Sequence, residues 1–394
     1  MKNLKNLLII FTLNLFNPFI TQSQSWQQSA SLPEAMQPVV VKAGNKIFAV
    51  KNALYNSEQP SFMYEYDVVG NTWTKRGQMS VLRTGFALIE ADGRIFAIGG
   101  LVQHDSVTTA LIEEYVISSG NWERKQDLPS SCTDMGVLTH ENKIYVVGGR
   151  KKIIENKVIK NVSCKSLFIY DILNNSWEKK SDMHKDRTYL SAVNINDKIY
   201  AIGGFNYNSF SGENSLEEYN ISSDTWTEKL CFANGSNGLN QAIEINNKIY
   251  VTLIDSTAHI AEYDPDLNTW TEKTELLSPI MDFAKVVIES QLYMIGGHLV
   301  SGMYYSDKVI RYNPADNTQI ILPENSHQWC GITEIEGVIY ILGGNIAKGA
   351  VPVPPPTNSV VKINTNEFNK LTNISPAYNL IRTYSNLVVT STTF

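Results

Sequence analysis

The amino-acid sequence predicts an all-β fold built from repeated four-stranded antiparallel sheets. Two recurring patterns carry this prediction: a tyrosine followed seven residues later by a tryptophan, and a short apolar run that ends in a glycine doublet. Both patterns recur with a period of about 50 residues, which is typical of repeat architectures. The tyrosine–tryptophan pairs are Tyr66/Trp73, Tyr115/Trp122, Tyr170/Trp177, Tyr219/Trp226 and Tyr263/Trp270, and Tyr312 keeps the spacing with Gln319 in place of the tryptophan.

The apolar run before each glycine doublet predicts a buried strand because it is rich in β-branched and aromatic residues. A second apolar run precedes it, joined through Asn, Asp or Gly residues that suit tight hairpins. The tyrosine ends a third strand, and the tryptophan opens a fourth. Seven copies of the run are present, of which the first and fifth lack the glycines: 46–50, 94–100, 143–149, 198–204, 248–252, 291–297 and 338–344.

A single sheet of this kind cannot bury both of its faces. Sheets arranged around an axis bury them against one another, and closing the ring leaves few exposed edges. We therefore expect a β-propeller of seven blades, with six or eight as the alternatives, in which tyrosine and tryptophan fill the space between blades. The predicted repeats span residues 26–73, 74–122, 123–177, 178–226, 227–270, 271–319 and 320–371, with 372–394 as a closing or leftover strand.

The order of glycine doublet, tyrosine and tryptophan resembles the signature of the kelch-repeat β-propellers. The resemblance extends over about residues 26–371. It implies a kelch-type propeller for residues 26–394 as one domain. It leaves the function open, because propellers host many activities.

Residues 1–25 precede the repeats and predict a signal peptide. Lys2 and Lys5 come before an apolar run that begins at Leu7, and Ser23-Gln24-Ser25 offers small residues for cleavage. The run is short for a membrane span. We therefore expect a secreted or periplasmic monomer without a membrane span. The formal net charge of −6 argues against non-specific nucleic-acid binding.

The cysteines and histidines predict neither a metal site nor a cofactor. No CxxC motif occurs, and the six histidines are scattered along the chain. Cys132 and Cys164 fall in one repeat and are the candidate disulfide, with unpaired thiols as the alternative, because spacing alone does not settle connectivity.

The entrance to each innermost strand is the most informative candidate site. Counting back 17 residues from the second glycine position gives Arg83, Cys132, Arg187, Asn237, Ile280 and His327, and Arg382 heads a similar Arg-Thr-Tyr triplet. Tyr189 and Trp329 lie two residues further along. The hypothesis is a cationic channel mouth that binds an anionic or carbohydrate ligand through Arg83, Arg187, His327, Trp329, Tyr189 and Arg382. The alternative is that the arginines pair with acids of a neighbouring blade.

Two repeats carry insertions in the connection between their second and third predicted strands. Residues 150–160 are a basic segment on an acidic protein, and residues 351–356 are proline-rich. A solvated loop and a rigid polyproline spacer are the plain interpretations of the two segments. The repeated Glu-Glu-Tyr triplets at 113–115 and 217–219 suggest a solvated outer strand.

Three functions fit this sequence. The first is a non-catalytic, secreted module that binds a protein or a glycan. The second follows from a similarity to secreted bacterial kelch propellers that interconvert the anomers of sialic acid, although no catalytic carboxylate can be matched. The third is a copper radical oxidase of the galactose-oxidase type, which would require clustered Tyr, His and Cys ligands. No catalytic residue is assigned.

Overall fold

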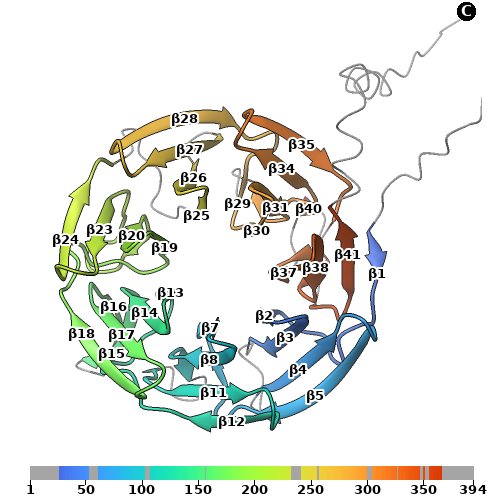
Figure 1. Ribbon diagram of the computed structural model, residues 1–394, viewed down its shortest axis with the longest axis horizontal. Helices are drawn as coiled ribbons and strands as arrows, with labels where there is room; N and C mark the ends of the chain where they lie inside the picture. Colours follow the sequence, from blue (N-terminus) through green and yellow to red (C-terminus); the bar gives the residue numbers. More distant parts are fainter. Residues whose placement is uncertain are drawn as a thin grey trace, which may run out of the picture.

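The computed structural model is a closed ring of antiparallel sheets around a central axis (Figure 1). It describes residues 26–52, 61–102, 107–155, 157–231, 241–254, 257–299, 304–325, 327–346, 349–350 and 355–365. The predicted signal peptide and the predicted closing segment 372–394 lie outside these residues. Within them, no helix has the length and apolar character required to cross a membrane. The all-β propeller predicted from the sequence is confirmed.

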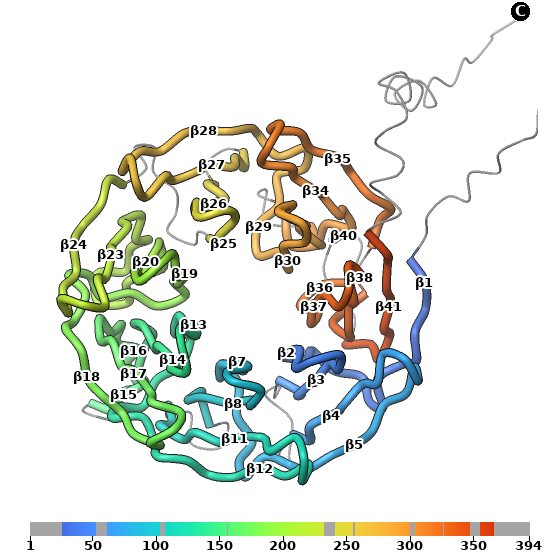
Figure 2. The backbone as a smooth tube through the Cα atoms, in the orientation of Figure 1, coloured from blue at the N-terminus to red at the C-terminus, as the bar shows by residue number. Residues whose placement is uncertain are grey.

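Six blades are built from four strands in chain order, with the first strand innermost (Figure 2). Blade 1 consists of β2 (Pro38–Ala43), β3 (Lys46–Lys51), β4 (Phe62–Asp67) and β5 (Thr72–Gln78). Blade 2 consists of β7 (Ala87–Ala91), β8 (Arg94–Ile98), β11 (Ile112–Val116) and β12 (Asn121–Arg124). Blade 3 consists of β13 (Gly136–His140), β14 (Lys143–Val147), β17 (Leu167–Asp171) and β18 (Ser176–Lys180).

The next three blades repeat this plan on the other side of the ring. Blade 4 consists of β19 (Ser191–Ile195), β20 (Lys198–Ile202), β23 (Leu216–Asn220) and β24 (Thr225–Lys229). Blade 5 consists of β25 (Ala242–Ile245), β26 (Lys248–Ile254), β27 (Ala258–Asp264) and β28 (Thr269–Glu275). Blade 6 consists of β30 (Ala284–Ile288), β31 (Gln291–Ile295), β34 (Val309–Asn313) and β35 (Thr318–Leu322).

Blade 7 joins the two ends of the described chain. It consists of β37 (Gly331–Ile335), β38 (Val338–Leu342), β41 (Val360–Asn364) and the N-terminal β1 (Gln27–Gln28). Gln27 pairs with Lys362 and Gln28 with Val361. The first residues after the predicted signal peptide therefore supply the outermost strand of the last blade.

Short strands in the connections form a second layer at one end of the ring. They are β6 (Arg83–Thr84), β9 (Leu101–Val102), β10 (Val107–Thr108), β15 (Arg150–Glu155), β16 (Val158–Ser163), β21 (Phe205–Asn206), β22 (Ser211–Gly212), β29 (Ile280–Met281), β32 (His298–Leu299), β33 (Tyr304–Tyr305), β36 (His327–Gln328), β39 (Asn345–Ile346) and β40 (Gly349–Ala350). They belong to the connections between the second and third strands and to the entrances of the innermost strands. We call this end the loop face.

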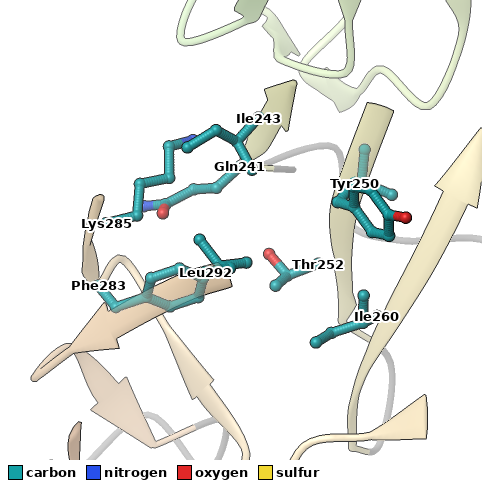
Figure 3. A pocket seen from close by; sticks show the side chains of 9 residues that line it. Gln241, Ile243, Tyr250, Thr252, Ile260, Phe283, Lys285 and Leu292 are labelled. Atoms are coloured by element: carbon teal, nitrogen blue, oxygen red, sulfur yellow. The ribbon is translucent and has the colours of Figure 1, made fainter. Parts of the chain in front are cut away.

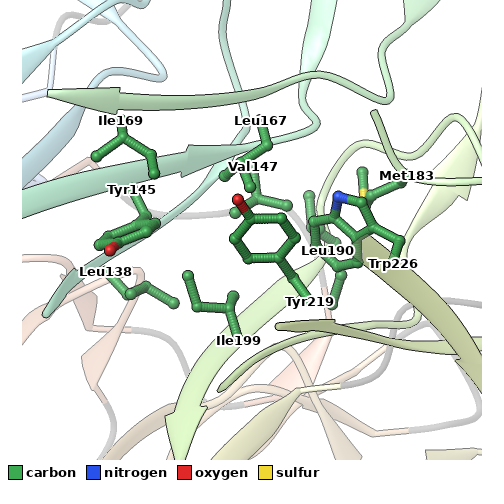
Figure 4. Close-up of a cluster of buried hydrophobic side chains, with 11 residues drawn as sticks. Leu138, Tyr145, Val147, Leu167, Ile169, Met183, Leu190, Ile199, Tyr219 and Trp226 are labelled. Atoms are coloured by element: carbon green, nitrogen blue, oxygen red, sulfur yellow. The ribbon is translucent and has the colours of Figure 1, made fainter. Parts of the chain in front are cut away.

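The hydrophobic core lies between neighbouring blades. In the cluster between blades 3 and 4, Tyr145 and Leu167 of blade 3 pack with Tyr219 and Trp226 of blade 4 (Figure 4). Tyr219 is fully buried, and its ring centroid lies 5.1 Å from that of Trp226. The tyrosine–tryptophan pairs therefore fill the seams of the ring, as their periodicity predicted.

In blades 1, 3, 4 and 5 the tryptophan also donates a hydrogen bond toward the preceding blade, whereas Trp122 of blade 2 has no such partner among the described residues. The indole Nε1 of Trp73 donates to the carbonyl of Ala30 at 2.8 Å, and Trp226 donates to Ser181 at 2.8 Å. In blade 6, where the tryptophan is missing, Gln319 Nε2 donates to the carbonyl of Glu275 at 2.7 Å. Gln319 thus keeps the hydrogen bond between blades while it gives up the aromatic ring.

The tyrosines are anchored by the turn that follows them. Tyr66 Oη donates to Asn71 Oδ1 at 2.7 Å, and the same oxygen accepts the amide of Ala30 at 2.8 Å. Asn71 has a positive φ of 50°, a conformation that asparagine tolerates better than most residues. The turn residue is therefore selected for its backbone conformation and for its contact with the neighbouring blade.

The expectation that the Glu-Glu-Tyr triplets lie on a solvated strand is wrong. Glu113, Glu114, Glu217 and Glu218 are all buried in the third strands of blades 2 and 4. Each is paired with basic side chains: for example, Glu218 lies 3.0 Å from Lys198 and 3.1 Å from Lys229. The third strand is covered by the fourth, so its acids are buried and require cationic partners.

Candidate functional site

Arg83 and Arg187 do not line an open channel mouth. Both side chains are buried, with relative exposures of 1% and 0%. Arg187 donates to the carbonyls of Gly203 and Ser215 and to Glu217 Oε1 at 2.6 Å. The structure corrects the expected placement, because the terminal nitrogens of both arginines are occupied by protein acceptors.

The alternative expected from the sequence, pairing with an acid of a neighbouring blade, also needs correction. Arg83 Nη2 donates to Glu113 Oε2 at 2.8 Å; Glu113 lies in β11 of blade 2, and Arg83 lies in β6, at the entrance to the innermost strand of the same blade. Arg187 and Glu217 belong to blade 4. Burial, opposed by Glu113, lowers the pKa of Arg83. Each arginine therefore braces the entrance of the innermost strand within its own blade.

His327 is likewise buried. Its Nδ1 lies 2.6 Å from Asn325 Oδ1, and burial lowers the pKa of His327 to about 4. The imidazole is therefore neutral at physiological pH and adds no positive charge to the mouth. Arg382, the remaining predicted cation, lies outside the described residues.

Tyr189 and Trp329, which the sequence analysis placed near the channel mouth, are half-exposed on the rim. They are 42% and 44% exposed. Both have a positive φ, 54° for Tyr189 and 49° for Trp329, just before the innermost strands β19 and β37. Asp134 and Asp282 hold the same position before β13 and β30, each with a φ of 53°. This recurring left-handed position carries acids, aromatics and, in blade 2, Gly85, so the part of the rim that the structure describes differs from the cationic mouth expected.

At the border of blades 3 and 4, an arginine completes the rim. Arg150 Nε donates to Asp134 Oδ2 at 2.7 Å, and its guanidinium lies 5.8 Å from the ring centroid of Tyr189 and 5.5 Å from that of Tyr207. The sequence placed Arg150 only at the start of a basic loop. The acid and the second aromatic come from other connections, so the arrangement could not be read from spacing.

The basic insertion forms a regular hairpin of β15 and β16 above blade 3 (Figure 1). Ile154 pairs directly with Ile159 across the hairpin, and both are exposed. Val158 and Ile153 are exposed as well. Branched apolar side chains on both strands, surrounded by lysines, distinguish this hairpin from an ordinary solvated loop.

Cys132 and Cys164 lie close together at the base of this hairpin. Cys132 Sγ donates to the carbonyl of Gly148 at 3.2 Å, and the amide of Cys164 donates to Gly149 at 2.8 Å. Both are free thiols in the structure. Hydrogen bonding to Cys164 and burial raise the pKa of Cys132, and the same hydrogen bond lowers the pKa of Cys164. The disulfide stays a prediction, and the two residues are placed together.

A small cavity of about 10 Å³ lies between blades 5 and 6, lined mostly by apolar side chains and by the polar residues Gln241, Thr252 and Lys285 (Figure 3). Lys285 Nζ donates to the carbonyl of Ala242 at 2.7 Å, and burial lowers the pKa of Lys285 to about 8. Gln241 Oε1 and Thr252 Oγ1 find no hydrogen-bond partner among the described residues. These polar groups suit ordered water, since buried water commonly satisfies such atoms.

In the described portion of the chain, no three His, Cys, Asp or Glu side chains are grouped so that they could hold a metal ion. His298 lies on the rim near Asp282, and His104 is outside the described residues.

Solved structures with a similar fold include two propellers. The structure titled "Structure of YjhT" superposes with a TM-score of 0.55 at 14% identity, covering 74% of this chain and 98% of that one. A fungal alcohol oxidase of the AA5 family, in complex with copper, superposes with a TM-score of 0.65 at 13% identity, covering 86% of this chain and 76% of that one. At these identities the likeness supports the fold alone.

Curated relatives carry the kelch repeat within longer proteins. Kelch-like protein 36 of Bos taurus is 25% identical over 274 residues, which are 65% of this chain and 42% of that protein. Kelch repeat and BTB domain-containing protein 1 of vaccinia virus (strain Copenhagen) is 28% identical over 155 residues, 39% of this chain and 26% of that protein. Alpha-scruin of Limulus polyphemus is 28% identical over 158 residues, 40% of this chain and 17% of that protein.

The chain thus spans less than half the length of these relatives. The family model described as the KLHDC2/KLHL20/DRC7 Kelch-repeats domain matches residues 85–297, more than half of the chain. With the glycine doublets, the seam tyrosines and the tryptophans in place, the chain belongs to the kelch-repeat family.

Proposed function

We propose that this protein is a non-catalytic, exported binding module that engages a protein partner through the loop face. The observation that supports the proposal is the hairpin β15–β16, whose tip exposes Ile154 at 64% and Val158 at 56%. Exposed branched side chains gathered on a regular element are typical of interaction sites, since isolated apolar residues are the usual surface pattern.

The charge of the hairpin indicates the chemistry of the partner. Lys151, Lys152 and Lys157 have no carboxylate within ion-pair distance in the described part of the chain, whereas Lys160 pairs with Glu155 at 2.5 Å. The whole protein has a net charge of −6. A local positive patch on an acidic protein favours an acidic partner with apolar residues, because complementary charge guides association and apolar burial provides affinity.

The test uses proteins from the medium of the source cells, captured on the immobilised wild-type chain and on two variants. Ile154→Asp with Ile159→Asp places charge on the hairpin. Leu173→Asp is the matched control, since Leu173 is 71% exposed on the turn between β17 and β18, at the opposite end of blade 3. We expect a partner retained by the wild type and by the control to be lost with the hairpin variant. Retention by all three proteins would contradict the proposal.

Export and carbohydrate binding are separate parts of the proposal. Expression of the full chain should yield a mature protein that begins near Trp26, which N-terminal sequencing checks. A glycan array tests the carbohydrate ligand suggested by the exposed ring of Trp329. Binding to a glycan that survives the hairpin substitutions would place that ligand on the rim, whereas silence across the array would leave the protein partner as the function.

A further inference from the structure

Two places on the rim share one three-part arrangement. In blade 3, Asp134 occupies the left-handed position before the innermost strand. Arg150 stands sixteen residues after Asp134, directly behind the glycine doublet, and Tyr189 occupies the left-handed position of the next blade. In blade 6, Asp282 occupies the left-handed position. His298 stands sixteen residues after Asp282, directly behind the glycine doublet, and Trp329 occupies the left-handed position of blade 7. The positions correspond one to one, so the first arrangement serves as an internal reference for the second.

The reference arrangement is complete. The Arg150 guanidinium donates to Asp134 at 2.7 Å and lies over the Tyr189 ring at 5.8 Å from its centroid. A cation above an aromatic face beside a carboxylate gains from both the ring quadrupole and the negative charge. The side chains of Arg150 and Asp134 are only 13% and 17% exposed, so the site is occupied by the protein's own guanidinium.

The second arrangement lacks this cation. His298 Nδ1 lies 3.7 Å from Asp282 Oδ2, which is beyond hydrogen-bond distance, and no described residue hydrogen-bonds to that nitrogen. The Asp282 side chain is 51% exposed, and His298 is the only basic group that the described residues place within ion-pair distance of it. The imidazole is shorter than an arginine side chain, and both the Asp282 side chain and Trp329 remain about half exposed.

The aromatic rings of the second arrangement contact one another directly. The ring of Trp329 lies 5.8 Å from that of His298 and 5.6 Å from that of Tyr305, and the rings of His298 and Tyr305 are 4.7 Å apart. These contacts hold the indole in place while 44% of Trp329 stays exposed. A braced indole is the strongest cation–π partner among the side chains.

We propose that Asp282 and Trp329 form a binding site for a guanidinium group supplied from outside the chain. The carboxylate accepts two N–H groups of the planar fork, and the indole face stacks against it. The group belongs either to a free small molecule or to an arginine of a bound peptide, and the chemistry of recognition is the same. The site lies at the border of blades 6 and 7 and does not depend on the hairpin of blade 3.

The proposed ligand is a cation, whereas the sequence analysis expected an anionic or carbohydrate ligand. An anionic ligand would meet an exposed carboxylate at Asp282, while Arg83 and Arg187, expected to attract it, are buried in ion pairs. Like charges at close range disfavour such binding.

The test is a titration of the mature protein with Nα-acetyl-arginine amide and with the matching citrulline amide, followed by ligand-observed NMR. Citrulline keeps the shape and loses the charge. We expect the arginine compound to bind at least about tenfold more tightly. A peptide with a single internal arginine distinguishes the two sources: tighter binding of the peptide than of the amide favours a peptide ligand, and equal binding favours a small molecule. Equal binding of arginine and citrulline would overturn the proposal.

Variants address the site directly. His298→Arg should rebuild the arrangement of blade 3 and abolish binding, because the protein's own guanidinium then fills the site. Asp282→Asn and Trp329→Gly should each weaken binding about tenfold. Glycine suits position 329, since blade 2 already has Gly85 at the equivalent left-handed position with a φ of 62°. Tyr189→Gly, in the filled arrangement, is the control and should bind as the wild type does. Undiminished binding by His298→Arg would also refute the site.

Discussion

At the residue scale, the buried arginine and its acid change together from blade to blade. Blades 2 and 4 carry Arg83 with Glu113 and Arg187 with Glu217. At the same two positions blade 3 has Cys132 and Phe168, and blade 6 has Ile280 and Ile310. A single buried charge without a counter-ion is destabilising, whereas an ion pair is tolerated and so are two apolar residues. In these blades the arginine and the acid are therefore present together or absent together.

We expect Glu113→Ala to lower the free energy of unfolding by about 3–5 kcal/mol, because it leaves the Arg83 guanidinium buried without its counter-ion. The double variant Arg83→Cys with Glu113→Phe copies blade 3 and should cost less than Glu113→Ala alone. Urea unfolding of the three proteins measures both effects. A double variant less stable than Glu113→Ala would show that the pair is not an independent unit.

The second prediction concerns Tyr115, whose hydroxyl is buried without a partner among the described residues. In five other blades the residue five positions after the tyrosine is Asn or Asp and accepts this hydroxyl, but here it is Gly120. Gly120 has a φ of 72°, and a Cβ there would meet only ordinary contacts at 3.4 Å or more. Gly120→Asn should therefore add a hydrogen bond and stabilise the fold by about 1 kcal/mol. Gly120→Ala, which adds no acceptor, is the control and should not stabilise it in thermal unfolding.

At the element scale, four third strands are held in register by an acid between two cations. Glu65, Glu114, Glu218 and Glu262 each precede the seam tyrosine and contact a basic residue of the second strand and one at or near the fourth strand. Lys248 and Lys273, for example, lie 3.1 and 3.0 Å from Glu262. Each acid therefore links three of the four strands of its blade.

These acids predict acid lability. Burial acts to raise the pKa of Glu218, but hydrogen bonds from Lys198, Tyr200 and Lys229 outweigh it and lower that pKa below the ordinary value. The same balance lowers the pKa values of Glu65, Glu114 and Glu262. A carboxyl with a lower pKa in the folded state stabilises the fold above its unfolded pKa, near 4.3. That contribution is lost as the pH falls through the folded value.

We therefore expect the midpoint of thermal unfolding to be level above about pH 5 and to fall steeply below about pH 4. Glu218→Gln should lower the midpoint at pH 7 and flatten its dependence on pH. Glu123→Gln is the control, because Glu123 is a half-exposed acid at the surface. If Glu218→Gln kept the full acid dependence of the wild type, the other carboxyls would account for it.

At the scale of the whole molecule, the ring depends on the N-terminal strand. Trp26 Nε1 donates to the carbonyl of Pro323 at 2.9 Å, and its ring packs against the cluster between blades 6 and 7. This contact repeats the one that Trp73 and Trp226 make elsewhere. The chain thus closes its ring with the same seam that joins consecutive blades.

Trp26→Ala should cost about 2–3 kcal/mol of unfolding free energy, less than a fully buried tryptophan because Trp26 is only partly buried. The effect should resemble that of Trp73→Ala, since the two seams are equivalent. Guanidinium unfolding compares the two variants. A Trp26→Ala protein as stable as the wild type would mean that β1 does not close the ring.

Much of the fold could be predicted from the sequence, and less of the site. The repeats were readable because strand pattern, turn residues and tyrosine–tryptophan spacing are local. Tyr189 and Trp329 could be assigned to one repeat position because they stand two residues after the candidate cations, and their role in binding stays a prediction. Arg83 and Arg187 were misplaced, because their partners Glu113 and Glu217 lie about thirty residues away in the chain and only the pairing of strands brings them together.

The sequence by itself determined the repeat, the strands within it and the family, since periodicity and turn chemistry act over a few residues. Only the tertiary structure decided which charges are buried and which are free. Asp134 and Asp282 are the same residue type at the same repeat position. Asp134 accepts a hydrogen bond from Arg150, whereas Asp282 faces His298 and solvent. The physical reason is that desolvation and pairing depend on neighbours from other blades, which spacing along the chain does not specify.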